Sequence, residues 1–350
     1  MGTPQLTIAL DAMGGDNAPK SVLRGANVAR RRWPDARFLV FGDEARIRPL
    51  VKRRRSLQKA ISIQHTTSAV APDEKPSVAL RSGRDSSMRL AIDDVRDGEA
   101  EGVVSAGNTG ALMAMSKFSL KTLAGIDRPA MASFFPTLRG ESVMLDLGAN
   151  VECTAENLVQ FAIMGEVFAR TVLGALEPTV GLLNVGSEEL KGNDSVRTAA
   201  SMLRELHHPL RFHGFVEGDD IAAGTVDVVV ADGFSGNIAL KTAEGTAKLY
   251  TEFLREAFRN SVMSRIGYLF SRRALKKLRA RVDPRRYNGA VFLGLRGISV
   301  KAHGGSDALA FATAIGVAVD MAKNGFIEQI KTEIESLHEA DPTGQQAAAS

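Results

Sequence analysis

Residues 105–110 combine residue types that can bind an anion. Their sequence, Ser-Ala-Gly-Asn-Thr-Gly, lies between a strand-like apolar run, residues 102–104, and a helix-like run, residues 111–115. Glycine lets a backbone approach a ligand closely, and the free N–H groups at a helix start carry partial positive charge. The segment predicts either a phosphate-binding turn or an ordinary tight turn. It matches neither G-x-G-x-x-G nor G-x-x-x-x-G-K-[ST], so it does not indicate a dinucleotide or P-loop site.

Alternating strand-like and helix-like runs must position this turn. The strand-like runs are residues 6–10, 37–41, 61–63, 102–105, 143–147, 180–184 and 226–231, and the helix-like runs are residues 19–32, 78–95, 158–173 and 306–322. Residues 290–293 and 298–300 flank Arg296-Gly297 and predict a hairpin with a short turn. This alternation predicts an α/β fold with a largely parallel sheet that is covered on both faces.

The same pattern predicts where ligands bind. In parallel sheets ligands lie outside the carboxyl ends of the strands. We therefore expect five polar loops to meet at one crevice, and these are residues 11–17, 105–110, 146–150, 184–193 and 232–237. The chain has no Pro- or Ser-rich linker and no repeat of fixed period. These observations favour one α/β domain over residues 1–325, followed at residues 326–350 by a C-terminal helix and a disordered tail that begins near Pro342.

Composition narrows the class of protein. The chain has 350 residues, 44% of them hydrophobic and 24% charged, as in ordinary globular proteins. Cys153 is the only cysteine, which excludes an internal disulfide and suits a reducing cytoplasm. The N-terminus does not resemble a secretory signal, and no apolar run approaches the length that spans a bilayer.

Positive charge is concentrated in residues 245–290. This segment holds twelve lysines and arginines against three acidic residues, although the whole chain carries a net charge of only +4. Apolar residues recur there every three or four positions, which predicts a basic amphipathic helical insertion. Amphipathic helices with a cationic face can lie on anionic lipid. The residues expected to contact the membrane are Phe258, Arg259, Ile266, Leu269, Phe270, Arg272 and Arg273.

Eight segments, read together and in order, resemble the motifs of the bacterial acyl-[acyl-carrier-protein]:phosphate acyltransferases of phospholipid synthesis. They are LDAMGGDNAP (10–19), SAGNTGA (105–111), LDLGAN (145–150), LLNVG (182–186), KGN (191–193), GFVEG (214–218), DGFSGN with LKT (232–237 and 240–242) and HGGSD (303–307). Each motif is weak by itself, but eight in register over nearly the whole chain are specific. The segment after Asn324 matches no motif of the family.

The resemblance implies a fold and an activity. The family fold is a Rossmann-like three-layer α/β/α sandwich, related to phosphotransacetylases and isopropylmalate-dehydrogenase-like enzymes, and its members are usually homodimers. Such enzymes move a long-chain acyl group from acyl carrier protein to inorganic phosphate. The acyl phosphate then feeds a membrane glycerol-3-phosphate acyltransferase in phosphatidic acid synthesis. The resemblance implies no cofactor, and it places the enzyme in the cytoplasm, peripherally attached to the inner face of the cell membrane.

This reaction needs binding and orientation more than a protein nucleophile. Phosphate is the nucleophile, so the site must hold an anion in line with a thioester and stabilise an oxyanion. With the resemblance included, three residues are candidates for catalysis. Lys191 would bind phosphate, His303 would move a proton and Asn237 would face the crevice. Their structural alternatives are a solvated loop lysine, a capping or buried histidine and a turn asparagine.

The candidate phosphate- or substrate-binding residues come from the same loops. They are Gly14, Gly15, Asp16, Asn17, Ser105, Gly107, Asn108, Thr109, Gly110, Asn150, Asn193, Asp232, Lys241 and Ser306. Lys241 is included because it lies four residues after Asn237, and residues four apart share one face of a helix. Ser306 has the alternative of capping the last helix.

Two further sites are considered and rejected. Cys153 has no histidine near it in sequence and is more typical of a small buried hydrophobe than of a nucleophile. Asp11, Asp16, Asp146 and Asp232 follow strands and are more typical of turn residues than of metal ligands, so no metal is expected.

Alternatives remain open for the basic segment and for the function. The segment can pack on the core or on a dimer partner, dock the acidic carrier protein, or attach the enzyme to a membrane; nucleic acid is disfavoured because no binding motif is present. The alternative functions are a phosphotransacetylase-like enzyme that uses acyl-CoA and a non-catalytic membrane-docking scaffold.

Overall fold

The computed structural model describes residues 6–206, 209–281 and 283–340. The strands are β1 (Thr7–Asp11), β2 (Arg37–Gly42), β3 (Ile61–His65), β4 (Gly102–Ser105), β5 (Ala130–Pro136), β6 (Glu141–Leu145), β7 (Thr179–Leu183), β8 (Arg211–Val216), β9 (Val228–Val230), β10 (Ala290–Leu293) and β11 (Ile298–Lys301). They form one sheet in the order β3-β2-β1-β4-β11-β10-β5-β6-β9-β7-β8.

Helices lie in most of the connections between the strands. The α-helices are α1 (Lys20–Arg32), α2 (Glu44–Lys52), α3 (Arg55–Gln58), α4 (Pro76–Ser82), α5 (Ser87–Arg96), α6 (Thr109–Leu120), α7 (Ala155–Phe168), α8 (Asp194–Glu205), α9 (Gly218–Ala223), α10 (Gly233–Arg259), α11 (Val262–Arg281), α12 (Ala308–Lys323) and α13 (Phe326–Ala340). A π-helical turn, Ala169–Leu173, extends α7, and a 3-10 turn, Pro284–Arg286, precedes β10.

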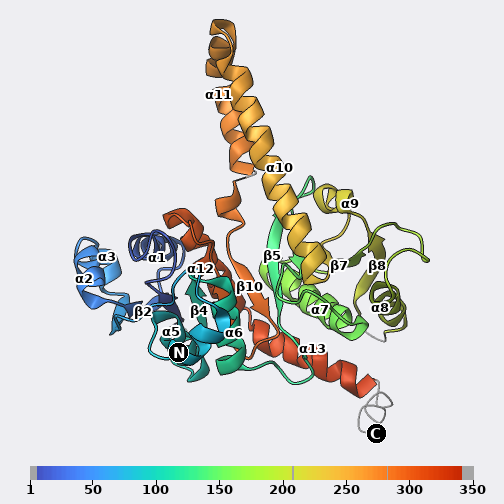
Figure 1. Ribbon diagram of the computed structural model, residues 1–350, viewed down its shortest axis with the longest axis horizontal. Helices are drawn as coiled ribbons and strands as arrows, with labels where there is room; N and C mark the ends of the chain where they lie inside the picture. Colours follow the sequence, from blue (N-terminus) through green and yellow to red (C-terminus); the bar gives the residue numbers. More distant parts are fainter. Residues whose placement is uncertain (1–5, 207–208, 282, 341–350) are drawn as a thin grey trace.

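The helices cover both faces of the sheet, so the architecture is the expected three-layer α/β/α sandwich (Figure 1). One buried cluster joins the sheet to α1, α7, α8, α12 and α13. A second joins it to α5 and α6, and a third to α9 and the start of α10. The phenylalanines Phe161, Phe168, Phe311 and Phe326 are among the largest fully buried side chains, and they lie in the first cluster.

The sheet consists of two parallel blocks with an antiparallel centre. Strands β3, β2, β1, β4 and β11 are mutually parallel, and so are β6, β9, β7 and β8. Between the blocks, β10 is antiparallel to β11 and to β5, and β5 is antiparallel to β6. The two blocks therefore run in opposite directions along the sheet, and each has its own set of loops at its carboxyl ends.

Several sequence expectations change in detail. The single helix expected at residues 78–95 is two helices, because the chain bends at Gly83 and restarts at Ser86, whose side chain accepts from the Arg89 N–H and caps α5. The antiparallel pairing of β10 with β11 confirms the expected hairpin. Strands β5 and β8 were not expected. The tail from Pro342 lies outside the described residues.

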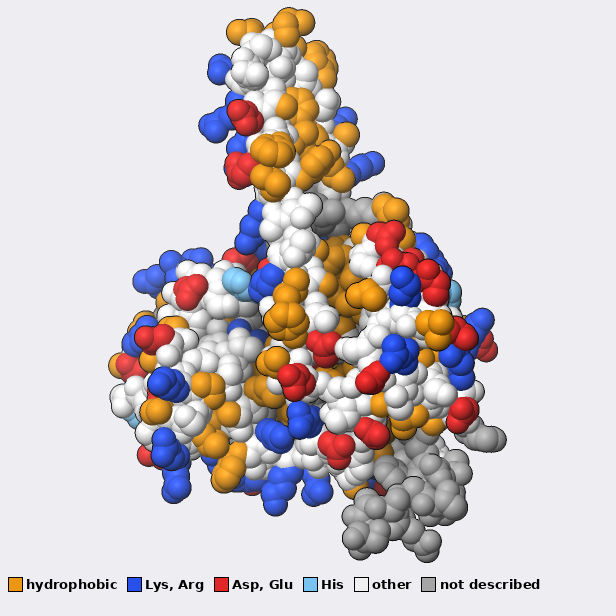
Figure 2. Space-filling view, turned by 45° about the vertical axis from the view of Figure 1, so that its right-hand side comes forward, with side chains coloured by type: hydrophobic (Ala, Val, Ile, Leu, Met, Phe, Trp, Pro, Cys, Tyr) orange, Lys and Arg blue, Asp and Glu red, His pale blue; other side chains and the backbone are white. Residues whose placement is uncertain are grey.

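The basic segment forms an arm. Helices α10 and α11 lie side by side and project from the body of the protein (Figure 1). Hydrophobic side chains gather along this arm with cationic side chains beside them (Figure 2). Among the described residues, no helix combines the length and the apolar character needed to cross a bilayer.

Candidate functional site

The predicted loops fall into two groups, which corrects the expectation of one crevice. Group I follows β1, β4 and β11. It contains the predicted loops 11–17 and 105–110 and also residues 301–307, which were not among the five predicted loops. Group II follows β6, β7 and β9 and contains residues 146–150, 184–193 and 232–237. Hydrogen bonds join loops within each group, and within the described ranges none joins group I to group II. The reversal of strand direction between the blocks explains the separation.

Asp11 organises group I. Its carboxylate is 1% exposed and accepts four hydrogen bonds. Oδ1 accepts from the Met13 N–H at 3.2 Å, the Gly14 N–H at 3.1 Å and the Ser87 hydroxyl at 2.6 Å. Oδ2 accepts from the Ser105 hydroxyl at 2.6 Å, and Ser105 Oγ in turn accepts from the Gly107 N–H at 3.0 Å. The hydrogen bonds of Asp11 and Ser105 therefore join the loop of residues 11–17 to the loop of residues 105–110.

Glycines allow the three loops of group I to approach one another. A Cβ at Gly14 would stand 2.7 Å from the Gly107 nitrogen, and one at Gly15 would stand 2.9 Å from the Gly304 carbonyl oxygen. Gly15 also has a φ of +95°, which L side chains rarely adopt. The Asp16 N–H donates to the Gly304 carbonyl at 3.0 Å. Backbone packing, rather than side-chain bulk, thus shapes this site.

The N-terminus of α6 supplies anion-binding groups beside this junction. Asn108 caps the helix by accepting from the Ala111 N–H, and its amide donates to the carbonyls of Ala71, Pro72 and Glu74. Asn108 is therefore a structural cap and loop tie rather than a free ligand. In the described residues, no protein group accepts the N–H groups of Thr109 and Gly110. Unpaired N–H groups at a helix start favour an anion.

Lys301 is a buried cation of group I that the sequence analysis missed. It is 8% exposed at the end of β11, where it pairs in register with Ser105 of β4. Its ammonium donates to the Ala302 carbonyl. Burial lowers the pKa of Lys301 to about 8, while Asp11 and Asp16 oppose that shift. The signal in the sequence was a lysine closing the strand Ile298–Lys301 directly before Ala302-His303-Gly304.

His303 lies exposed in the loop that follows Lys301. Its Nδ1 accepts from the Gly305 N–H at 3.1 Å, which places the proton of the neutral ring on Nε2. The backbone N–H of His303 donates to Asn288 Oδ1 at 3.0 Å, which holds the backbone at this residue in place. Ser306 is buried and donates to the His303 carbonyl, which makes it a loop tie. His303 thus presents an N–H to solvent from a rigid loop.

The polar side chains of group II mostly satisfy one another. Asp146 is fully buried and accepts from the N–H groups of Met131, Ala149 and Asn150 and from the Asn150 amide. Burial raises the pKa of the Asp146 carboxyl despite these bonds. Asn150 also donates to the Pro129 carbonyl at 2.8 Å, and Asn237 donates to the Leu147 carbonyl at 2.9 Å. Asn150 and Asn237 are therefore positioned as structural residues.

Three helices begin around a cavity in group II. Thr154 caps α7, Asn193 caps α8 and Asp232 caps α10 by accepting from backbone N–H groups. The cavity of about 740 Å³ is also lined by Cys153 and by the acidic side chains Glu152 and Asp194. Burial raises the pKa of the Cys153 thiol to about 11, so it is a poor nucleophile at neutral pH.

Neither candidate lysine of the sequence analysis is buried. Lys191 is exposed on the loop between β7 and α8. Lys241 is exposed on α10 and forms an ion pair with Glu244 at 2.9 Å. The expectation that Asn237 and Lys241 act together is not supported by their contacts, since one bonds the backbone of Leu147 and the other bonds Glu244.

Group I therefore carries more groups that can bind an anion than group II does. They are a buried ammonium, the N-terminus of a twelve-residue helix and an imidazole N–H. These groups suit a phosphate and the oxyanion of an acyl transfer. Among the described residues, no cluster of three or more metal-ligating side chains is found.

Comparisons with known proteins agree with this chemistry. The chain matches the family described as "Fatty acid synthesis protein" over residues 6–329. A phosphate acyltransferase of Rhodospirillum centenum is 67% identical over 333 residues, which is 95% of this chain and 94% of the relative. One of Rhodospirillum rubrum is 63% identical over 94% of each chain.

Solved structures support the fold. A phosphotransacetylase from Streptococcus pyogenes superposes with a TM-score of 0.63 at 17% identity and covers 91% of this chain and 94% of its own. A branched-chain phosphotransacylase from Enterococcus faecalis superposes with a TM-score of 0.57 at 13% identity. The match covers 91% of this chain and 99% of the other. At these identities the likeness concerns the fold alone.

Proposed function

Since the chain belongs to the fatty acid synthesis protein family and is an acyltransferase, we propose that it transfers a long-chain acyl group from acyl carrier protein to inorganic phosphate. The product would be an acyl phosphate for phosphatidic acid synthesis, used by a membrane glycerol-3-phosphate acyltransferase. The relatives named phosphate acyltransferase support the acceptor. The observation that carries the assignment of the site is the buried ammonium of Lys301 on β11, which pairs in register with the end of β4, the strand that leads into α6.

The chemistry follows from these groups. An oxygen of hydrogen phosphate attacks the thioester carbonyl, the C–S bond breaks, and the phosphate proton passes to the thiolate sulfur. Acyl phosphate and free thiol result. The N–H groups of Thr109 and Gly110 and the ammonium of Lys301 stabilise the phosphate and the developing oxyanion. The Nε2–H of His303 can donate a hydrogen bond to the thiolate that leaves, while the proton that the sulfur takes up comes from phosphate.

A direct assay tests the proposed function. Purified protein is mixed with palmitoyl-acyl carrier protein and phosphate, and acyl phosphate is trapped as the hydroxamate. We expect loss of thioester that depends on phosphate, because phosphate is the nucleophile. Loss of thioester at the same rate without phosphate would contradict the proposal.

A second candidate differs only in the acyl donor. The alternative enzyme, left open by the sequence, takes the acyl group from an acyl-CoA. Palmitoyl-CoA and palmitoyl-acyl carrier protein, compared in the same assay, separate the candidates through kcat/KM.

The family resemblance leads us to propose a homodimer, and the arm supports its peripheral attachment to a membrane. Leu269 and Phe270 on α11 are 65% and 83% exposed, and Ile266 is 45% exposed. Phe258 is partly buried because its ring packs edge-on against Tyr268 at 5.5 Å. Arg259, Arg272 and Arg273 are exposed beside these residues. An arm with apolar and cationic side chains both exposed fits an anionic lipid surface.

Liposome sedimentation tests the membrane attachment. We expect the wild type to sediment with anionic and not with neutral liposomes, because each basic residue near anionic lipid contributes about 1 kcal/mol. The variant with Leu269→Ser and Phe270→Ser should remain in the supernatant. Leu176→Ser, at a 92% exposed position in the body, is the matched control and should sediment like the wild type. Equal sedimentation of all three proteins would refute the attachment through the arm.

A further inference from the structure

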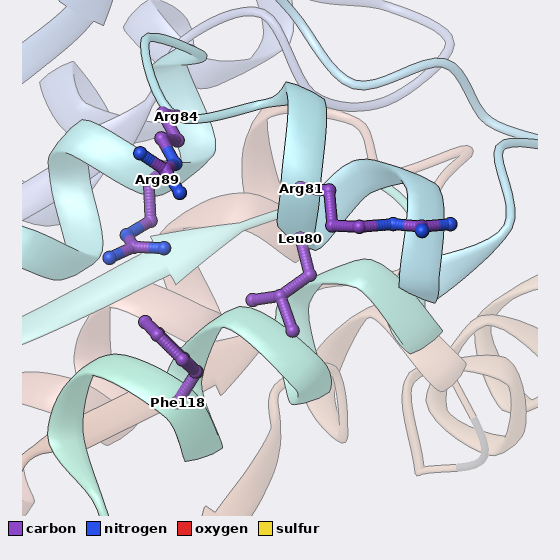
Figure 3. Close-up of a pocket in the computed structure, with 5 residues that line it drawn as sticks. All are labelled: Leu80, Arg81, Arg84, Arg89 and Phe118. Carbon is purple, nitrogen blue, oxygen red and sulfur yellow. The ribbon is translucent and has the colours of Figure 1, made fainter.

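A cavity of about 450 Å³ lies between α4, α5 and α6, outside both loop groups. Arg81, Arg84, Arg89, Leu80 and Phe118 line it (Figure 3). In this view Arg84 and Arg89 lie together on one side, and Phe118 lies below Arg89. The guanidinium of Arg89 is 5.3 Å from the centre of the Phe118 ring, and the ring is 61% exposed. An exposed aromatic beside several arginines is typical of protein docking surfaces.

Exposed cations near this cavity have no ion-pair partner among the described residues. Arg89 is paired with Asp93, but Arg81, Arg84 and Lys117 form no ion pair with any carboxylate that the structure describes. Arg81 donates to the Ser77 carbonyl of its own helix and is otherwise solvated. All three cations are exposed. The face therefore presents cations that a partner's carboxylates can pair with.

Helices α4 and α6 connect this face to group I. A Cβ at Gly110, in the first turn of α6, would stand 2.7 Å from Pro76 at the start of α4. One at Gly83, just after α4, would stand 3.0 Å from Met115 in the middle of α6. The two helices thus run side by side in the same direction. At 1.5 Å per residue, Phe118 lies about 12 Å along α6 from Gly110.

We propose that this face, defined by Arg81, Arg84, Lys117 and Phe118, docks the acidic carrier protein that delivers the acyl thioester. The proposal rests on the function proposed above. Arg84 and Arg89 lie on the side of the cavity where the exposed aromatic anchor lies, and Arg81 extends from α4 on the other side (Figure 3). The α4–α6 pair leads from that anchor to the unpaired N–H groups of Thr109 and Gly110. A carrier bound here would hold its thioester arm along α6 toward the phosphate.

Charge reversal tests the docking face. We expect the double variant Arg81→Glu, Arg84→Glu to raise KM for palmitoyl-acyl carrier protein about tenfold or more at low salt, with kcat nearly unchanged. The same variant should use palmitoyl-pantetheine, which lacks the carrier protein, as the wild type does. Lys331→Glu, an exposed reversal on α13, is the matched control and should change neither parameter.

A direct binding measurement gives a second readout that needs no turnover. Fluorescence anisotropy of labelled carrier protein should show a Kd about tenfold weaker for the double variant and unchanged for Lys331→Glu. An unchanged Kd in the double variant would overturn the proposal. So would a loss of carrier binding only on Arg272→Glu, Arg273→Glu, because the arm would then be the docking site. A wild type without phosphate-dependent thioester loss would contradict the proposed function instead.

Discussion

Replacing Lys301 with methionine is expected to lower kcat/KM for phosphate by about 10²- to 10³-fold, the usual cost of removing one preorganised group that stabilises transition-state charge. Methionine keeps the length and apolar stem of the side chain and removes only the ammonium. Lys323→Met, an exposed lysine at the end of α12, is the matched control and should retain activity. Steady-state kinetics with phosphate as the varied substrate measure the effect. Activity in Lys301→Met equal to that of the control would exclude this role.

The pH profile tests the same ammonium in the wild type. Burial lowers the pKa of Lys301 to about 8, and the neighbouring charges that oppose this shift are the carboxylates of Asp11 and Asp16. Since the protonated form stabilises the anions, kcat/KM should fall as the pH rises through about 8. His303 is exposed in the same loop, so the profile of the variant His303→Gln is measured as well, and the fall near pH 8 should remain in it.

As the pH rises from 8 to 10.5, the free energy of unfolding of the wild type should increase while its activity falls. A pKa lowered from 10.5 to about 8 means that burying the ammonium costs about 3 kcal/mol below pH 8, where both folded and unfolded chains are protonated. Between pH 8 and 10.5 the unfolded chain binds more protons, so the wild type gains stability there. Lys301→Met should therefore be at least as stable as the wild type at pH 7, by urea unfolding, and lose that advantage toward pH 10.5.

The second large effect concerns Asp11. Asp11→Ala removes the acceptor of four hydrogen bonds in the interior, and we expect a loss of about 3 kcal/mol in the free energy of unfolding. The loops that carry Gly14 and Gly107 would lose their tie, and a displacement of about 1 Å there can cost about 100-fold in rate. Urea unfolding and the hydroxamate assay measure both. Asp35→Ala, at an exposed position, is the control.

Asp11→Asn distinguishes the structural role of Asp11 from its charge. The amide oxygen can still accept from Met13, Gly14 and Ser87, while the amide nitrogen donates to Ser105, so the fold should be kept. The lost negative charge was one of the causes that raise the pKa of Lys301. The fall in kcat/KM should therefore move to lower pH than in the wild type. A profile that moves to higher pH would contradict the coupling between Asp11 and Lys301.

Local pattern predicted the fold class because each strand, glycine turn and helix start has its own signature. The turn at residues 105–110 does join β4 to α6, and Asp307 caps α12 by accepting from the N–H groups of Leu309 and Ala310. Pattern could not show that β5 reverses the direction of the second block, since strand pairing depends on contacts distant in sequence. The single-crevice expectation failed for that reason.

Side-chain roles were harder to predict than elements. Asn108, Asn150 and Asn237 were expected to bind ligand, yet their amides bond backbone carbonyls. A sequence shows that an asparagine is near a turn but not which carbonyl it reaches. Lys301 was missed because a lysine at a strand end usually points to water, and only the packing around β11 buries it.

The position of β11 also affects how the chain is made. Ile298 pairs with Gly102, so the strand that lies beside β4 is synthesised long after β4 itself. Until then β4 has an open edge, and open edges are prone to aggregation. The same late strand carries Lys301. A chain that ends before β11 therefore lacks both the strand that pairs with β4 and the cation of group I, so the folding of the sheet and the completion of the proposed site depend on the same late segment.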